Sequence, residues 1–345
     1  ARQARRQAGS GFKPFVYTAA IAAGIPASRV IVDGPVVLPQ LQDDDWRPAN
    51  FSNTFEGPMT IREGLRRSIN MIAIKLGVDE VGLESVAQTA RRMGLSTQIE
   101  RYPSTTIGAV EVIPLEMAEA YSAFPTLGTK VEPFPVLRVE DAQGNVVWEP
   151  QPERTTVLDS LVASIMVSML EDAANSGTGA NLRAIGQLPY EVPAAGKTGT
   201  TNDGTNVWFS GFTPNLAATV WFGMDTPQPI FELGVGRQAT GGGLAAPVWG
   251  DFMRRVYYGV EGDEEFGVEP QEPLLQVPER WVPHPGLNPV LVDSRTGLLA
   301  SQWCPEEDQY MEYYIPGTEP TEFCDRSNRR FRMPGVPSFP GIPRR

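Results

Sequence analysis

The feature that most constrains the fold of this chain is the pair formed by Ser10 and Lys13. If Ser10 opens a helix, Lys13 lies one turn further along the same face, so its amine can reach the serine hydroxyl. A lysine amine accepts a proton near neutral pH only when burial or a neighbouring positive charge lowers its pKa. The fold must therefore bury Lys13 or place a positive charge beside it, and Lys197 is a candidate for that charge.

A second motif carries polar residue types that suit the same chemistry. Ser68 and Asn70 fall at a predicted break between two helices. There they can cap the second helix, or they can point into a cleft beside Ser10. These two residues alone leave both interpretations open.

A third motif, Lys197 to Thr200, begins a predicted strand. Gly199 has no side chain, so it lets a substrate approach the strand backbone closely. Thr198 and Thr200 can bind a carboxylate beside the charge of Lys197. A lone Ser-x-x-Lys is weak evidence for catalysis, but the three motifs in this order are strong evidence for a reactive serine.

The three motifs resemble the active site of the penicillin-binding proteins and serine β-lactamases, whose middle motif is Ser-Asp-Asn where this chain has Ser-Ile-Asn. Much of residues 1–260 also resembles the transpeptidase domain of class A, bifunctional penicillin-binding proteins. The longer stretches that carry this resemblance are Arg6–Phe15, Pro58–Glu63, Pro114–Ala118 and Gly196–Asp203.

The resemblance implies an α+β, penicillin-recognising fold like that of β-lactamases and transpeptidases. Such a fold has an antiparallel sheet flanked by helices, plus an all-helical subdomain. In the family, a helix and two sheet strands precede the nucleophile helix, and a glycosyltransferase domain and a membrane anchor precede those. We therefore expect the N-terminal strands and the membrane anchor to be missing from this chain, which resembles a piece of a longer protein.

The implied activity is that of a peptidoglycan D,D-transpeptidase. Ser10 would attack the penultimate D-alanine carbonyl of a stem peptide while Lys13 takes its proton. The terminal D-alanine would leave, and an amine of a second stem peptide would resolve the acyl-enzyme. β-Lactam antibiotics would acylate Ser10 because their ring mimics the D-Ala-D-Ala end, and no metal or organic cofactor is needed.

The resemblance also implies supporting roles for the other motif residues. Ser68 would relay a proton between the lysine base, Lys197 and the leaving amine. Asn70 would hold the backbone amide of the substrate. The backbone amides of the nucleophile and of Thr200 would form the oxyanion hole.

Two other classes of protein remain open at this point. In a D,D-carboxypeptidase or a β-lactamase, water rather than an amine resolves the acyl-enzyme. Class A β-lactamases activate that water with a dedicated glutamate, for which Glu56 and Glu171 are only unassigned candidates. The other alternative is a non-catalytic penicillin-binding sensor or scaffold, against which the three intact motifs count.

Charge and hydropathy restrict the partners and the location. The formal net charge of −12 argues against a nucleic-acid backbone as the main partner. No run of about 18 apolar residues occurs, so the sequence contains no membrane span. The resemblance implies membrane anchoring only through a missing N-terminal segment. By resemblance we expect an extracytoplasmic location, in the periplasm or on the cell-wall face of the inner membrane.

The counts of histidine and lysine exclude some chemistries. The one histidine, His284, lies between two prolines, which argues against a Ser-His-Asp triad and excludes a histidine-rich zinc site. Only four of the 29 basic residues are lysines, and two of these four belong to the motifs described above. Arginine cannot substitute in chemistry that needs a titratable amine.

Periodicity and turn residues predict the main elements. Thr60 is expected to cap a helix with Glu63 as its capping-box partner. Residues 31–58 carry many turn formers, so we expect a surface loop that borders the cleft. Predicted helices cover about 10–23, 60–67, 71–76, 80–92, 114–124, 156–174 and 245–258, a hairpin covers 136–148, and antiparallel strands begin at 197, 207 and 217.

The composition changes near residue 260, which divides the chain into a transpeptidase domain, 1–260, and a C-terminal extension, 261–345. The extension is acidic and rich in proline, so we expect it to be a linker or an irregular segment. Cys304 and Cys324 lie in it at a spacing that suits a disulfide, which would fit an extracytoplasmic protein. Two free buried thiols are the alternative.

Overall fold

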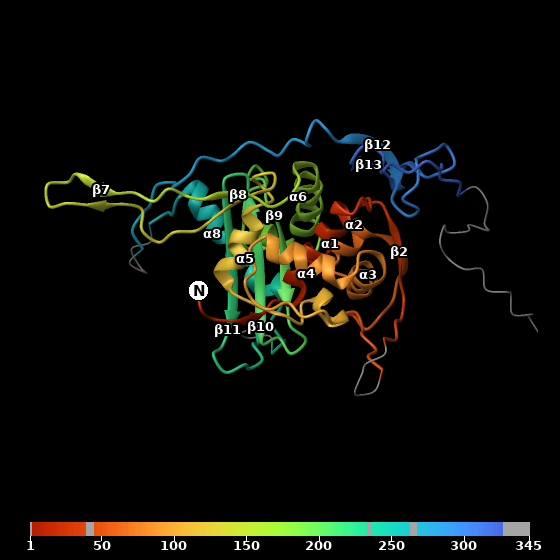
Figure 1. Cartoon of the computed structure of the whole chain (residues 1–345), viewed down its shortest axis with the longest axis horizontal. Helices are drawn as coiled ribbons and strands as arrows, with labels where there is room; N and C mark the ends of the chain where they lie inside the picture. The colour runs from red at the N-terminus through yellow and green to blue at the C-terminus, as the bar shows by residue number, and fades with distance from the viewer. Residues whose placement is uncertain (1, 39–44, 233–235, 263–267, 327–345) are drawn as a thin grey trace, which may run out of the picture.

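The computed structural model describes residues 2–38, 45–232, 236–262 and 268–326 of the chain. At its centre is an antiparallel sheet of three strands in the order β11-β10-β9, with helices packed on both faces (Figure 1). The strands are β9 (Ala195–Thr200), β10 (Asn206–Thr213) and β11 (Leu216–Gly223). The predicted strands, their antiparallel pairing and the α+β class are confirmed.

Strand β10 is buried on both faces, which explains its nearly continuous apolar sequence. Trp208 and Phe212 belong to the hydrophobic cluster on one face, whereas Phe209 packs on Trp249 in the cluster on the other, with ring centroids 5.2 Å apart. The covering helices are α1 (Lys13–Ala22), α5 (Pro114–Ser122) and α6 (Ser160–Asn175) on the first face, and α7 (Asn181–Ala184) and α8 (Ala246–Tyr258) on the second.

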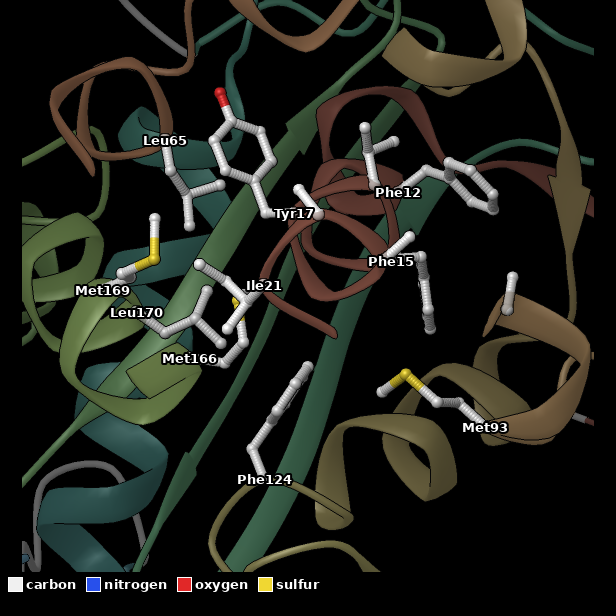
Figure 2. Packing of buried hydrophobic residues seen from close by; sticks show 14 of the residues in the cluster. Phe12, Phe15, Tyr17, Ile21, Leu65, Met93, Phe124, Met166, Met169 and Leu170 are labelled. Atoms are coloured by element: carbon white, nitrogen blue, oxygen red, sulfur yellow. The ribbon is translucent and has the colours of Figure 1, made fainter. Parts of the chain in front are cut away.

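Helix α1 is the centre of the larger cluster. Its residues from Lys13 to Ile21 are all buried, as expected for a helix that is apolar on nearly every face. Figure 2 shows Phe15, Tyr17 and Ile21 leaving this helix in different directions, with Ile21 close to Met166 of α6. Lys13 lies in the first turn of this helix and is therefore buried together with its apolar neighbours.

The first helix starts differently from the prediction of one regular helix from Ser10 to about Ala23. Gly9–Phe12 forms a 3₁₀ turn, η1, and α1 begins only at Lys13. Gly9 has a φ of +52°, and a side chain there would lie 2.5 Å from the carbonyl oxygen of Thr200. The close contact between η1 and the sheet therefore determines the tighter turn.

Short elements surround this core. The remaining helical segments are α2 (Ile61–Arg66), α3 (Asn70–Lys75), η2 (Leu76–Glu80), α4 (Leu83–Arg92), η3 (Pro103–Ile107), η4 (Gly241–Ala245) and η5 (Glu306–Asp308). The remaining paired strands of the first 260 residues are β1 (Arg6–Gln7) with β4 (Glu111–Val112), β2 (Val30–Asp33) with β3 (Gly57–Thr60), β5 (Thr129–Val131) with β8 (Arg154–Thr156), and β6 (Val139–Glu140) with β7 (Val146–Trp148). The predicted hairpin at Gly144 is confirmed as β6–β7. Within the described ranges, every helix is too short or too polar to cross a bilayer.

The segment predicted as a surface loop over 31–58 is paired at both ends, because β2 and β3 are neighbouring antiparallel strands. Asn50, in its middle, is buried and contacts the start of α3. The predicted cap of α2 is confirmed, since the Thr60 hydroxyl accepts a hydrogen bond from the Glu63 amide. The Glu63 carboxylate pairs with Arg66 rather than completing the capping box.

The C-terminal segment contains a hairpin, β12 (Asn288–Asp293) with β13 (Gln309–Tyr314), so the prediction of a linker or an irregular segment is wrong for these residues. Glu312 of β13 is fully buried, and its carboxylate accepts two hydrogen bonds from Arg62 of α2, at 2.6 and 2.8 Å. A charged residue in a strand usually indicates an exposed position, and the partner that makes this one buried lies far away in the sequence. Cys304 and Cys324 form a disulfide beside the hairpin, and residues 327–345 of the predicted extension lie outside the described residues.

Candidate active site

Four polar side chains from three separate segments meet beside β9. Lys13 comes from α1, Ser68 from the connection between α2 and α3, Asn70 from the first position of α3, and Lys197 from β9. The Lys13 amine donates to the Ser68 carbonyl at 2.6 Å and to Asn70 Oδ1 at 2.8 Å, and lies 3.3 Å from Ser68 Oγ. The Lys197 amine donates to Ser68 Oγ at 2.8 Å. The Ser68 hydroxyl therefore lies between two lysine amines.

Ser68 reaches this position through an unusual backbone conformation. Its φ of +61° lies in the left-handed region, which residues other than glycine seldom adopt. Backbone hydrogen bonds from Ser68 to Leu65 and from Ile69 to Gly64, at 3.1 and 2.9 Å, hold the turn between α2 and α3. Such strain is common at functional sites and persists because the surrounding contacts impose it.

The two lysines lie in a strongly non-aqueous environment. Both have no solvent exposure, and neither forms an ion pair with a carboxylate in the described part of the chain. Burial lowers the pKa of Lys197 to about 7. Burial also holds the pKa of Lys13 well below its usual range, and the charge of Lys197 adds to that effect. Burial and a neighbouring positive charge, either of which can lower the pKa of a lysine base, are therefore both present at Lys13.

Ser10 lies in η1, half-buried, one turn before Lys13, whose amide donates to the Ser10 carbonyl. The turn is held by the Tyr121 hydroxyl, which donates to the Gly11 carbonyl at 2.8 Å. We expected the Lys13 amine to reach the Ser10 hydroxyl, but no hydrogen bond joins them among the described residues. The amine is held by Ser68 and Asn70 instead. Catalytic hydrogen bonds often form only when substrate binds.

The glycine of the third motif has a packing role. A side chain at Gly199 would lie 2.6 Å from the carbonyl oxygen of Ala8 and 3.1 Å from the amide of Gly11. The absence of a side chain thus lets η1 cross β9 at backbone distance and brings Ser10 to the strand. The predicted approach of a substrate to the same glycine stays a prediction.

The two threonines of the third motif are already hydrogen-bonded. Thr198 Oγ1 lies 2.6 Å from the hydroxyl of Thr178, and Thr200 Oγ1 accepts from the Gly241 amide at 2.9 Å. Thr178 was missed by the sequence analysis because its Gly-Thr-Gly context predicts only the end of a helix. Hydroxyl groups can rotate, so binding of a carboxylate by Thr198 and Thr200 stays a prediction.

The two glutamates considered as water activators lie elsewhere. Glu56 forms an ion pair with Arg67 on the surface. Glu171 lines a cavity of about 290 Å³ together with Arg183 and Arg280, and burial raises its pKa to about 7. Neither carboxylate is hydrogen-bonded to a motif residue in the described part of the chain.

Two family models match parts of this chain. Residues 1–254 match the model of the penicillin-binding protein transpeptidase domain, and the chain belongs to that family. Residues 283–329 match a second model, the C-terminal domain of penicillin-binding protein 1A. The expected resemblance to class A penicillin-binding proteins is thereby confirmed.

Individual relatives agree with this assignment. Penicillin-binding protein 1A of Neisseria meningitidis serogroup B is 35% identical over 299 residues, which cover 83% of this chain and 36% of the relative. The Pseudomonas aeruginosa protein of the same name is 32% identical over 303 residues, or 73% of this chain and 36% of the relative. The chain thus spans about a third of the length of these curated relatives.

Solved structures confirm the fold. The crystal structure of penicillin-binding protein 1A from Haemophilus influenzae superposes with a TM-score of 0.80 at 27% identity, covering 94% of this chain and 50% of that one. The PonA1 protein from Mycobacterium tuberculosis in complex with penicillin V gives a TM-score of 0.63 at 23% identity, covering 76% and 72%. The penicillin-recognising fold expected from the sequence is confirmed.

Proposed function

We propose that this chain is a peptidoglycan D,D-transpeptidase that cross-links stem peptides through an acyl-enzyme on Ser10. The observation that carries the proposal is the Ser68 hydroxyl held between two buried lysine amines, beside the turn that bears Ser10. Membership of the transpeptidase family supports it. No metal or organic cofactor is required.

In the proposed acylation, Lys13 acts as the base. A neutral amine has two hydrogens and one lone pair. The nearest acceptors, the Ser68 carbonyl and Asn70 Oδ1, have no hydrogen to give, so they engage the two hydrogens of Lys13. The lone pair is then available for the Ser10 proton while Ser10 Oγ attacks the penultimate D-alanine carbonyl of a stem peptide.

Collapse of the tetrahedral intermediate breaks the peptide bond, and the leaving D-alanine amine needs a proton. Ser68 Oγ contacts both amines, so a proton can pass from Lys13 or Lys197 through Ser68 to that amine. The backbone amides of Ser10 and Thr200 would stabilise the oxyanion. Asn70 would bind the substrate backbone, and Thr198 with Thr200 would bind its terminal carboxylate, while Gly199 leaves room for the peptide.

An amine of a second stem peptide then attacks the acyl-enzyme and completes the cross-link. β-Lactams are proposed to acylate the same serine, and the reaction is proposed to take place in the periplasm or on the cell-wall face of the inner membrane. Residues 261–345 are proposed to form a separate C-terminal unit, because a different family model matches within them.

The test is intact-mass spectrometry after incubation of the full chain with benzylpenicillin, repeated with Ser10→Ala. We expect a penicilloyl adduct that lasts for hours and is absent from the variant. A short-lived adduct with product release would instead indicate a β-lactamase or carboxypeptidase. An adduct without release of D-alanine from a stem-peptide substrate would indicate a sensor or scaffold. A folded chain that forms no adduct would refute the assignment of Ser10.

A further inference from the structure

We propose that Asp33 and Asn50 are positioning residues, which fix the side chain of Asn70 with its oxygen toward Lys13. Both are buried, with 1% and 4% of their surfaces exposed, although they belong to a segment whose sequence predicts a surface loop. The proposal rests on the proposed function, because it concerns how the base Lys13 is kept ready for Ser10.

The first step is the orientation of the Asn50 amide. The Asp33 carboxylate only accepts hydrogen bonds, and it accepts one from Asn50 Nδ2 and one from the Glu56 amide, both at 2.8 Å. The second hydrogen of Asn50 Nδ2 goes to the Thr54 carbonyl at 2.9 Å. Reversing this amide would place its oxygen against two acceptors, so Asn50 Oδ1 must point the other way.

The second step is the start of α3. Asn50 Oδ1 accepts hydrogen bonds from the backbone amides of Asn70 and Met71, at 2.9 and 3.3 Å. The residue at the N-cap position, Ile69, has an apolar side chain and cannot supply this contact. Asn50 therefore caps α3 from a distant part of the sequence and fixes the backbone of Asn70.

The third step is the orientation of the Asn70 side chain. Its Nδ2 donates to the carbonyl of Ala49, the neighbour of Asn50, at 2.8 Å. Asn70 Oδ1 must then face the other side, where it accepts from the Lys13 amine at 2.8 Å. Residues 49 and 50 thus hold both the backbone and the side chain of Asn70.

This orientation has a chemical consequence for the base. With Oδ1 toward it, Lys13 donates a hydrogen and keeps its lone pair. If the Asn70 amide were reversed, its NH₂ group would donate to that lone pair, and Lys13 could not accept the proton of Ser10. The same reversal would disfavour the protonated amine, because two donors would face each other.

The test uses Asp33→Asn in the full chain, because the new amide must direct a donor either at Asn50 Nδ2 or at the Glu56 amide. The first measurement is an NMR pH titration of isotope-labelled lysine, which is simple because the chain has only four lysines. We expect the titration midpoint of Lys13 to move to lower pH. The second is the acylation rate with benzylpenicillin, which we expect to fall about tenfold, the usual effect of one hydrogen bond to a charged group.

Two further variants separate positioning from general destabilisation. In an Asn70→Ala background, Asp33→Asn should cause no further loss of rate, whereas independent effects would add. The exchanged pair Asp33→Asn with Asn50→Asp should recover part of the rate, because it restores every contact of the network except the one to Thr54. Ser52→Ala, an exposed change in the same loop, is the control and should leave both readouts unchanged.

The outcomes are distinguishable from a failure of the proposed function. If the wild-type chain is not acylated at Ser10, the proposed function fails, but the Lys13 titration still tests the positioning. If Asp33→Asn lowers the thermal unfolding midpoint yet leaves the Lys13 titration and the acylation rate unchanged, the two residues are only structural and the inference is overturned.

Discussion

Replacing Lys197 with methionine should abolish acylation and, at the same time, stabilise the folded chain near neutral pH. Lys197 is fully buried, and burial lowers its pKa from 10.5 to about 7. That difference corresponds to a cost of about 5 kcal/mol when the group is protonated in both states. Methionine is unbranched and apolar, so it avoids this cost. Loss of the hydrogen bonds from Lys197 to Ser68 and Thr198 destabilises the variant by roughly 1 kcal/mol each and offsets part of this gain.

The pH dependence gives the sharper test. Between the folded pKa of about 7 and the unfolded value of 10.5, the unfolded chain binds more protons at Lys197 than the folded chain does. The stability of the wild-type chain should therefore rise with pH across this window, by up to about 1.4 kcal/mol per pH unit from this group. Lys197→Met lacks this contribution. The free energy of unfolding of this variant should exceed that of the wild-type chain by about 2 kcal/mol at pH 7.5, and the difference should disappear by about pH 9.

The assay is urea unfolding followed by tryptophan fluorescence, at several pH values between 6.5 and 9.5. Trp208, directly beside the motif strand, is a suitable reporter. Lys130→Met is the matched control, because it removes a lysine that pairs with Glu119, and it should lower the stability instead. If the difference between the wild-type chain and Lys197→Met does not change with pH, the buried amine does not carry the cost assigned to it.

Three further changes test other parts of the structure. Gly199→Ala should destabilise the chain by about 1–3 kcal/mol and slow acylation, whereas Gly11→Ala, whose added methyl meets only ordinary contacts, should be tolerated; equal effects in thermal unfolding would contradict the packing argument. Glu312→Gln should cost about 1.5–3 kcal/mol because a neutral amide replaces the buried carboxylate that accepts two hydrogen bonds from Arg62, although Asp172 still pairs with that guanidinium; an unchanged unfolding midpoint would show that the hairpin is not anchored there. Cys304→Ser should lower the stability of the C-terminal hairpin by about 3 kcal/mol, measurable as faster proteolysis of that segment, since the disulfide closes a loop of 20 residues.

The sequence was sufficient to predict the helices and strands that leave a local pattern of apolar and turn residues. The strands β9 to β11 and the helices α1, α5, α6 and α8 follow from periodicity and turn residues, and the structure contains each of them. The contacts among Lys13, Ser68, Asn70 and Lys197 agree with the motif prediction, because the motifs restrict both residue type and order. Their catalytic roles stay proposals.

Two of the failures of prediction, those at residues 31–58 and at β13, have a common physical cause. Asn50 and Asp33 have the composition of a surface loop, and their burial is favourable because they hydrogen-bond each other, the backbone of the same loop and the distant amide of Asn70. The same holds for Glu312 of β13. An acidic residue predicts an exposed position, and only its pairing with the distant Arg62 explains its burial. Long-range pairing of polar groups leaves no periodic signal in the local sequence.

The contact between η1 and the sheet has a consequence for sequence variation. At Gly9 and Gly199, backbone lies against backbone with no side chain between, and the glycine at 108 meets the carbonyl of Gly9 in the same way. The position of Ser10 is therefore insulated from the identity of most core side chains. Substitutions among the apolar residues of α1, α5 and α6 that conserve volume should therefore leave Ser10 in place. Variation at these three glycines, by contrast, is transmitted directly to the serine.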